Sequence, residues 1–286
     1  MRTLLILCYG VLCYVVFFLT FLYTIGFVGD FLVPATLDRP QPAGPATLSA
    51  WIIDLALLGI FAVQHSGMAR HGFKAWLTRG LSPAIERSTY VLLSSLVLIL
   101  LFWQWRPLPR SVWDVTARWD ESALYALFAL GWLLVLTGTF VINHFDLFGL
   151  RQVWLYARRK PGTPLPFKRH FYYRIVRHPL MLGFLIAFWA TPHMSVGHLL
   201  FAIATTGYIV IAVKYFEERD LIAAHGSDYR RYQREVPMLC PWPRPHDKAS
   251  RSTSRGDALS ASVDADGPGR LPYDALQHRK HDVVAL

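Results

Sequence analysis

A short basic motif, Arg177-His178-Pro179 followed by Gly183, has the residue types of an anion-binding helix start. Proline is preorganised for a first helical position, where its missing N–H costs nothing, so a helix should begin at Pro179 with His178 near its N-cap. Free backbone N–H groups beside a forked guanidinium can hold a carboxylate. Gly183 would let a flat ring or another backbone approach closely. Alternatively, Arg177 meets lipid headgroups and Gly183 packs against a helix.

A second group of polar residues, Tyr208, Tyr215 and Glu218, falls near one helical face at spacings of seven and three, with Glu217 beside it. Glu218 can accept hydrogen bonds from ribose hydroxyls, and tyrosine rings can hold a sulfonium cation by cation–π contacts. The alternative is that Glu217 and Glu218 pair with Arg219 or with a basic loop. These residue types suit a ligand that carries hydroxyl groups and a positive charge.

Three histidines are candidates for acid–base chemistry. His65 and His144 each end an apolar segment, and His178 belongs to the basic motif. Polar residues at the edge of a membrane span are a functional hypothesis by default, although a histidine there can also be hydrated or cap a helix. The sequence does not rank the three, and all remain candidate catalytic residues.

The elements that position these residues are long apolar segments. Hydrophobic residues make up 53% of the 286 residues and charged residues 17%, against about 25% in soluble domains. A span needs about 20 apolar residues, which predicts an all-α polytopic transmembrane helix bundle of five or six spans. The fifth segment is too short to cross alone and could form a hairpin or re-entrant element with the sixth. The segments are Leu4–Val28, Leu48–Gln64, Tyr90–Trp105, Ala123–Ile142, Leu180–Ala190 and His198–Tyr215.

Loop charges predict the orientation of the bundle. Residues 66–88 carry four basic residues against Glu86, and residues 143–178 carry eight against Asp146. The positive-inside rule places both loops in the cytoplasm, with both termini on that side, in a bacterial inner membrane. The net charge of +10 and the pI of about 9.7 therefore follow topology and do not indicate nucleic acid. Three cysteines without framework spacing suggest neither a disulfide nor a metal site.

The segment after Tyr215 is charged and should be cytoplasmic. Ser227 is a plausible N-cap of a short helix that Pro237 ends. Residues 246–286 are rich in Ser, Asp, Arg and Gly, which predicts a disordered tail. Residues 1–245 would then form one transmembrane domain.

The C-terminal half resembles the isoprenylcysteine carboxyl methyltransferase and nurim superfamily. Arg177 to Gly183 matches the superfamily motif RHPxYxG, except that Met181 stands where that motif usually has tyrosine. The residues similar to the superfamily's EERxL…G…Y…Y…P ending are Glu217-Glu218-Arg219-Asp220-Leu221, Gly226, Tyr229, Tyr232, Pro237 and Pro241. The resemblance covers about residues 170 to 243.

The first half resembles methanethiol S-methyltransferases of the nurim family. This likeness is carried by residues 23–34, by Phe61-Ala-Val-Gln64-His65-Ser66 and by residues 85–91. It implies methyl transfer from S-adenosylmethionine to the thiol methanethiol, giving dimethyl sulfide, on a multi-pass enzyme in the lipid bilayer. The cofactor half would span about residues 143–243.

Carried over residue by residue, the resemblance implies a set of cofactor-binding residues. It also implies that Tyr229 and Tyr232 support a cytoplasmic lid over the cofactor. With Tyr215, the expected cofactor-binding residues are Arg177, His178, Gly183, Glu217 and Glu218. We expect Arg177→Ala or Glu218→Ala to abolish methyl transfer while the protein still folds. The alternatives are methylation of another thiol or of an isoprenylcysteine carboxylate, a sterol-type reductase, and a non-enzymatic nurim-like membrane protein.

Overall fold

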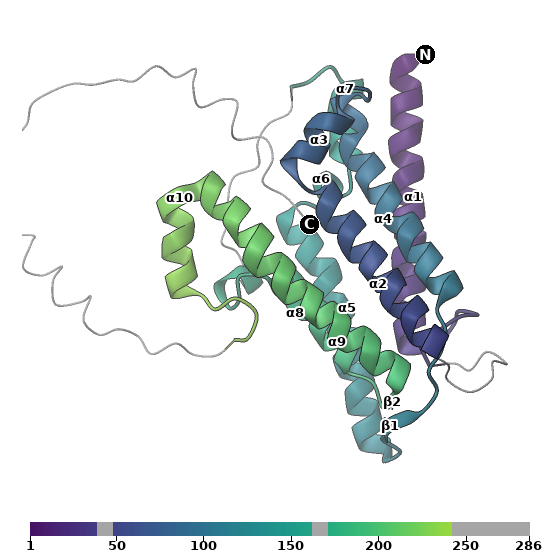
Figure 1. The fold of residues 1–286 in the computed structure, drawn as a ribbon. Helices are drawn as coiled ribbons and strands as arrows, with labels where there is room; N and C mark the ends of the chain where they lie inside the picture. The colour runs from purple at the N-terminus through teal and green to yellow at the C-terminus, as the bar shows by residue number, and fades with distance from the viewer. Residues whose placement is uncertain (39–47, 162–170, 242–286) are drawn as a thin grey trace, which may run out of the picture.

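The protein is a bundle of long helices tied at one end by a short two-stranded sheet (Figure 1). The computed structural model describes residues 1–38, 48–161 and 171–241. The predicted tail, 246–286, lies outside them. The elements are α1 Arg2–Gly29, α2 Leu48–Met68, α3 His71–Leu77, α4 Pro83–Gln104, β1 Ser111–Asp114, α5 Arg118–Ile142, α6 His144–Leu147, α7 Leu150–Ala157, the 3₁₀ helix η1 Phe171–Arg174, α8 Pro179–Trp189, β2 His193–Ser195, α9 Val196–Ala212, the π-helix η2 Val213–Glu217 and α10 Glu218–Glu235.

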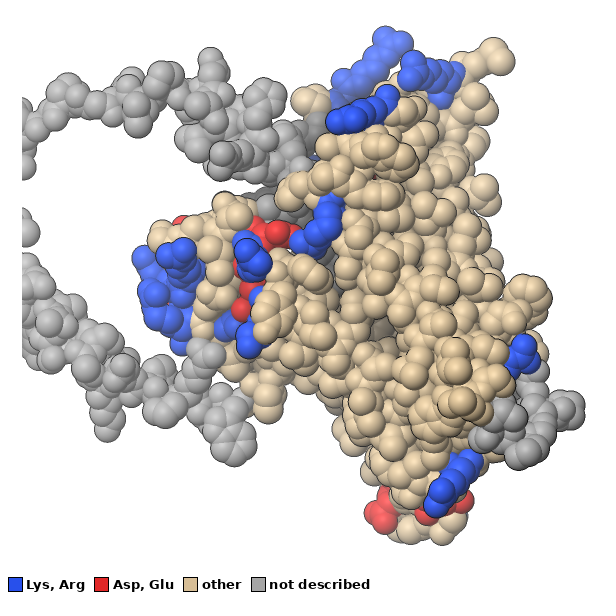
Figure 2. Space-filling model, in the orientation of Figure 1, with Lys and Arg blue, Asp and Glu red and all other residues tan. Residues whose placement is uncertain are grey.

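Within the described residues, five helices are long and apolar enough to cross a membrane: α1, α2, α4, α5 and the continuous helix that begins with α9. Their outward faces carry exposed apolar side chains such as Leu12, Val63 and Leu130. Figure 2 shows a broad face without charged side chains, with basic groups gathered at the end where α3 and α7 lie and over α10. The chain is therefore an integral membrane bundle, as predicted.

The N-terminus, α3, α6 and α7 lie at one end of the bundle, and β1 and β2 lie at the other (Figure 1). The helices of the two basic loops, α3 and α6 with α7, are thus on the same side as the N-terminus. At the opposite end β1 pairs antiparallel with β2, joining Ser111 to Ser195 and Asp114 to His193. This pairing fixes the turn between α8 and α9.

The short helix α8 packs against α5 through glycines. A Cβ atom on Gly131 would lie 2.8 Å from the Gly183 carbonyl oxygen, and one on Gly183 would lie 2.8 Å from the Gly131 carbonyl oxygen. Small residues let membrane helices approach this closely. At Gly138 a Cβ would lie 3.5 Å from that of Leu180, so α8 begins beside the last turns of α5. At 11 residues α8 is only about 16 Å long. It packs against α9 in a hairpin, one of the two arrangements expected from the sequence.

Two elements depart from the apolar segments read in the sequence. Helix α4 begins at Pro83 rather than Tyr90, because a helix can continue beyond the bilayer and proline suits its first position. Helix α10 begins at Glu218 and bends at Gly226, whose φ of 55° and ψ of −125° suit glycine. The predicted helix start at Ser227 coincides with this bend.

Candidate functional site

A cavity of about 470 Å³ lies inside the bundle, with walls from α1, α2, α4, α5, α8 and α9. Most of its wall is apolar and aromatic, including Phe21, Phe102, Trp132, Phe184 and Phe201. One end is polar and includes Tyr173, Arg177, His178, Glu217, Asp220, His225, Tyr229 and Tyr232. A charged ligand group and an apolar molecule can therefore meet inside one cavity.

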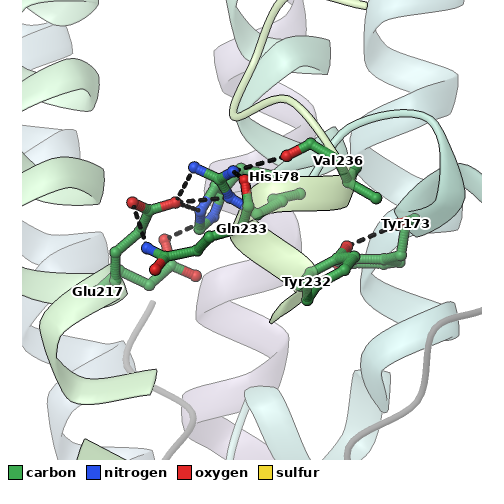
Figure 3. Close-up of polar contacts among 8 residues, drawn as sticks. Tyr173, His178, Glu217, Tyr232, Gln233 and Val236 are labelled. Atoms are coloured by element: carbon green, nitrogen blue, oxygen red, sulfur yellow. Dashed lines mark hydrogen bonds and ion pairs between the residues drawn. The ribbon is translucent and has the colours of Figure 1, made fainter. Parts of the chain in front are cut away.

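Arg177 is 7% exposed and clamps three parts of the chain together. Its Nε and Nη2 donate to Glu218 Oε1 at 2.7 and 2.5 Å. Its Nη1 donates to the carbonyls of Gln233 at 2.9 Å and Val236 at 2.6 Å, in the cluster drawn in Figure 3. The Gln233 amide in turn donates to Glu218 Oε2 at 3.0 Å. The structure thus shows the alternative stated for Glu218, an ion pair with a residue of the basic loop.

The backbone at the start of α8 is also tied to the end of α10. The N–H of Arg177 donates to the Pro237 carbonyl at 2.9 Å, and that of His178 donates to the Met238 carbonyl at 3.1 Å. His178 is the N-cap residue of α8, as predicted, and Pro179 follows it at the helix start. These two N–H groups bind the protein's own backbone and are not offered to a ligand.

His178 lies between two carboxylates. Its Nδ1 is 3.1 Å from Glu217 Oε2 and its Nε2 is 3.4 Å from Glu218 Oε1. Burial alone would lower the pKa of His178, but the charges and hydrogen bonds of Glu217 and Glu218 outweigh it and raise the pKa to about 9. His178 therefore carries a positive charge to the cavity wall at neutral pH.

This raised pKa predicts that stability depends on pH. A histidine whose pKa is higher in the folded state contributes stability that is complete below its unfolded pKa of about 6.5 and is lost as pH rises through about 9. The melting temperature of the purified protein should fall between pH 6.5 and 9. In His178→Gln, which does not titrate, this part of the fall should be absent; an equal fall in both proteins would contradict the assignment.

The π-helix η2 explains how both glutamates reach His178. In a regular helix, Tyr208, Tyr215 and Glu218 would share a face, but a π-turn adds a residue and shifts the phase. Tyr208 lines the cavity, whereas Tyr215 is 51% exposed with its ring 5.5 Å from the Lys214 ammonium. The structure thus places Tyr215 outside the site that the spacing predicted, because η2 interrupts the regular helix.

Gly183 also lies away from the cavity. Its Cα faces α5, where a Cβ would lie 2.8 to 2.9 Å from Gly131 and Val135. The alternative reading of this glycine, close helix packing, is the one that the structure shows. Gly183 therefore seats α8 against α5.

His65 and His144 both line the cavity, as His178 does. The Tyr90 hydroxyl lies 3.0 Å from His65 Nδ1 and 2.9 Å from its Nε2. His144 bonds to the Tyr14 hydroxyl through Nε2 at 2.8 Å. The fold thus brings the three predicted histidines to one space, from α2, α6 and the start of α8.

Sequence reasoning missed several residues that build the site. Tyr14, Tyr90 and Thr139 lie within apolar helices, where a hydroxyl group is the only signal. Gln233 resembles any polar residue of a cytoplasmic helix, yet it binds Glu218. Tyr232 was expected as a support, and its hydroxyl donates to the Tyr173 carbonyl at 2.6 Å (Figure 3).

Known proteins resemble this chain over most of its length. Residues 55–237 match the NnrU protein family. A methanethiol S-methyltransferase of Mycobacterium tuberculosis (strain ATCC 25618 / H37Rv) is 58% identical over 86% of this chain and 100% of its own length. One from Pseudomonas sp. (strain GM41(2012)) is 48% identical over 82% of this chain and 89% of its own.

More distant similarity extends to a protein of animals. Nurim from Sus scrofa is 30% identical over 60% of this chain and 74% of its own length. No solved structure matches the chain significantly.

Proposed function

Because the chain belongs to the NnrU family and shares 58% identity with a methanethiol S-methyltransferase, we propose that it methylates methanethiol with S-adenosylmethionine, giving dimethyl sulfide. The observation that carries the proposal is this identity, which spans the other protein's full length. The cavity supports it, because one end is polar and the rest is apolar. The chain is a membrane methyltransferase.

The polar end fits the chemical groups of S-adenosylmethionine. That molecule has a carboxylate, an ammonium, a sulfonium cation and ribose hydroxyls. His178 offers a positive charge for the carboxylate, and Glu217 and Asp220 offer carboxylates for cationic groups or hydroxyls. The rings of Tyr173 and Tyr229 can face the sulfonium. Arg177 and Glu218 act through the fold, by holding η2 against α8.

Methyl transfer is an in-line displacement, so the protein chiefly aligns the reacting atoms and excludes water. S-adenosylmethionine supplies an electrophilic methyl group. The apolar wall, with Phe21 and Trp132, accepts a small apolar thiol and keeps the space dry. The thiolate is the nucleophile, and a thiol is mostly protonated near neutral pH, so a neighbouring base is needed.

We further infer that both termini face the cytoplasm of a bacterial inner membrane. The helices α3, α6 and α7 of the basic loops share one end of the bundle with the N-terminus, and the positive-inside rule assigns this end to the cytoplasm (Figure 1). The polar end of the cavity belongs to this side, within the cofactor half of about residues 143–243. A charged cofactor made in the cytoplasm reaches it without crossing the bilayer.

The test is headspace gas chromatography of a bacterial host that makes no dimethyl sulfide, expressing this chain and supplied with methanethiol. Wild type should release dimethyl sulfide.

Glu217→Gln keeps an acceptor for His178 but loses a charge at the cavity. We expect this variant to raise the KM for S-adenosylmethionine by about 10- to 100-fold, because hydrogen bonds to charged groups contribute about 1.5–3 kcal/mol. Release by wild type that is independent of S-adenosylmethionine, or no release with protein confirmed in the membrane, would contradict the proposal.

A further inference from the structure

His144 has hydrogen-bond partners on both ring nitrogens, and they define its tautomer. Thr139 Oγ1 lies 2.8 Å from Nδ1, and the Tyr14 hydroxyl lies 2.8 Å from Nε2. The Thr139 hydroxyl donates its only proton to the Leu136 carbonyl at 2.6 Å, so toward His144 its oxygen accepts. Nδ1 therefore carries the proton of the neutral ring. Nε2 has the free lone pair, to which Tyr14 donates.

The surroundings of His144 favour the neutral ring. His144 is only 4% exposed. The Phe140 ring stacks on the imidazole with ring centres 4.3 Å apart, and the rings of Phe148 and Phe145 lie edge-on with their centres 4.9 and 5.4 Å away. Burial lowers the pKa of His144 below its usual value. The imidazole is thus in its basic form at neutral pH.

The charged groups around His144 are engaged elsewhere. The charged residues on α6 and on the helices that contact it include Asp146 in α6 itself, Arg151 from α7 and Arg87 from α4. Arg151 Nη1 binds Asp146 Oδ1 at 2.8 Å, and Arg87 Nε donates to the Leu147 carbonyl at 2.8 Å. These contacts hold α6 in place.

The other two histidines of the cavity are less suited to accept a proton. His178 is kept cationic by Glu217 and Glu218 and has no lone pair to offer. His65 meets the hydroxyls of Tyr90 at 2.9 to 3.0 Å and Ser94 at 3.3 Å. Both hydroxyls can donate or accept, so the tautomer of His65 is not defined by its partners.

We propose that His144 is the catalytic base of the thiol methylation, an inference that rests on the proposed function. Methanethiol replaces the Tyr14 hydroxyl at Nε2. The S–H bond breaks, an N–H bond forms at Nε2, and the electron pair stays on sulfur. The thiolate then forms a C–S bond to the methyl carbon while the donor's C–S bond breaks, leaving both electrons on the donor's sulfur.

Tyr14 and Thr139 are positioning residues in this step. Thr139 keeps the proton on Nδ1, so that the Nε2 lone pair is the one that can accept a proton in every turnover. Before methanethiol binds, the Tyr14 hydroxyl donates to the neutral ring, and after the thiolate has left Nε2 the hydroxyl can turn to accept from the new Nε2–H. The same tyrosine thus stabilises the ring before and after it takes the proton.

The test compares wild type and His144→Gln in dimethyl sulfide formation by the purified protein, with methanethiol and S-adenosylmethionine, from pH 6 to 10. At pH 7 the variant should be about 10²- to 10⁴-fold slower, as expected for loss of a general base. The gap should narrow as pH rises, because solution thiolate then replaces the missing base. S-adenosylmethionine affinity, measured by calorimetry, should be unchanged.

Two further variants test the positioning. Thr139→Val removes the acceptor of Nδ1–H at nearly constant volume and should slow turnover at pH 7, and Thr139→Ser should restore it. A loss in His144→Gln that does not change with pH, or the pH-dependent loss appearing in His65→Gln instead, would overturn the assignment. Wild-type turnover in His144→Gln would overturn it too while leaving the proposed function standing, whereas an inactive wild type would contradict the function itself.

Discussion

Glu218→Ala should destabilise the purified protein by about 3–5 kcal/mol and abolish methyl transfer, because removal of one partner leaves a buried charge uncompensated. Arg177 would lose its ion pair at 2.5 Å, and Gln233 would lose its acceptor at 3.0 Å. The link from η2 to α8 would go with them. The measurement is thermal and denaturant unfolding in detergent, together with methyl transfer activity.

Glu218→Gln is the matched variant, since it keeps an acceptor for Arg177 without the charge and should lose less stability. Arg219→Ala, at an exposed position next in sequence, should unfold close to wild type. A loss of stability in Glu218→Ala would correct the sequence-based expectation that alanine at 177 or 218 leaves the fold intact. If Glu218→Ala unfolds at the wild-type temperature, the clamp does not stabilise the fold.

Gly183→Val should prevent α8 from seating against α5, with loss of both folded protein and activity. Even the first added carbon would lie 2.8 to 2.9 Å from backbone and side-chain atoms of Gly131 and Val135. Backbone cannot move aside as a flexible side chain can, so the cost should exceed the usual 1–3 kcal/mol or so of overpacking. The yield of monodisperse protein after detergent extraction, and its melting temperature, measure the effect.

Gly59→Val is the control for this substitution. Gly59 lies in a membrane-spanning helix, α2, and a Cβ there would meet no atom within 4 Å. Its yield and melting temperature should stay near those of wild type. Equal losses in the two variants would mean that valine is harmful anywhere in the spans and that the α5–α8 contact has no special role.

The spans could be predicted from sequence because lipid imposes a simple rule on composition. Apolar residues 48–64 and 123–142 fall inside α2 and α5, and the short segment at 180–190 became the short helix α8. The π-helix η2 could not be predicted in this way, since residues 213–217 carry no proline or glycine to mark it. For that reason the spacing could not indicate that Tyr215 is exposed, away from the cavity that Tyr208 lines.

The candidate site was predicted in part. The basic motif and the glutamate pair indicated Arg177, His178 and Glu217, which the fold brings to one cavity. Their partners could not be predicted, because Arg177 bonds to carbonyls 56 and 59 residues further along the chain. Backbone carbonyls leave no signature in side-chain types. The contact between Tyr14 and His144 could not be predicted either, because the two residues are 130 positions apart in the sequence.

The hydrogen bonds to the backbone carbonyls just after α10 mean that the site forms only if the chain extends beyond that helix. The carbonyls of Val236, Pro237 and Met238 receive three of the N–H groups of Arg177 and His178. A frameshift or stop codon before these positions would leave every membrane span intact, yet it would remove the acceptors that hold Arg177 and the start of α8. Such a truncated gene product would insert normally and still lack a formed site, so for this protein membrane insertion alone is a poor measure of an intact gene.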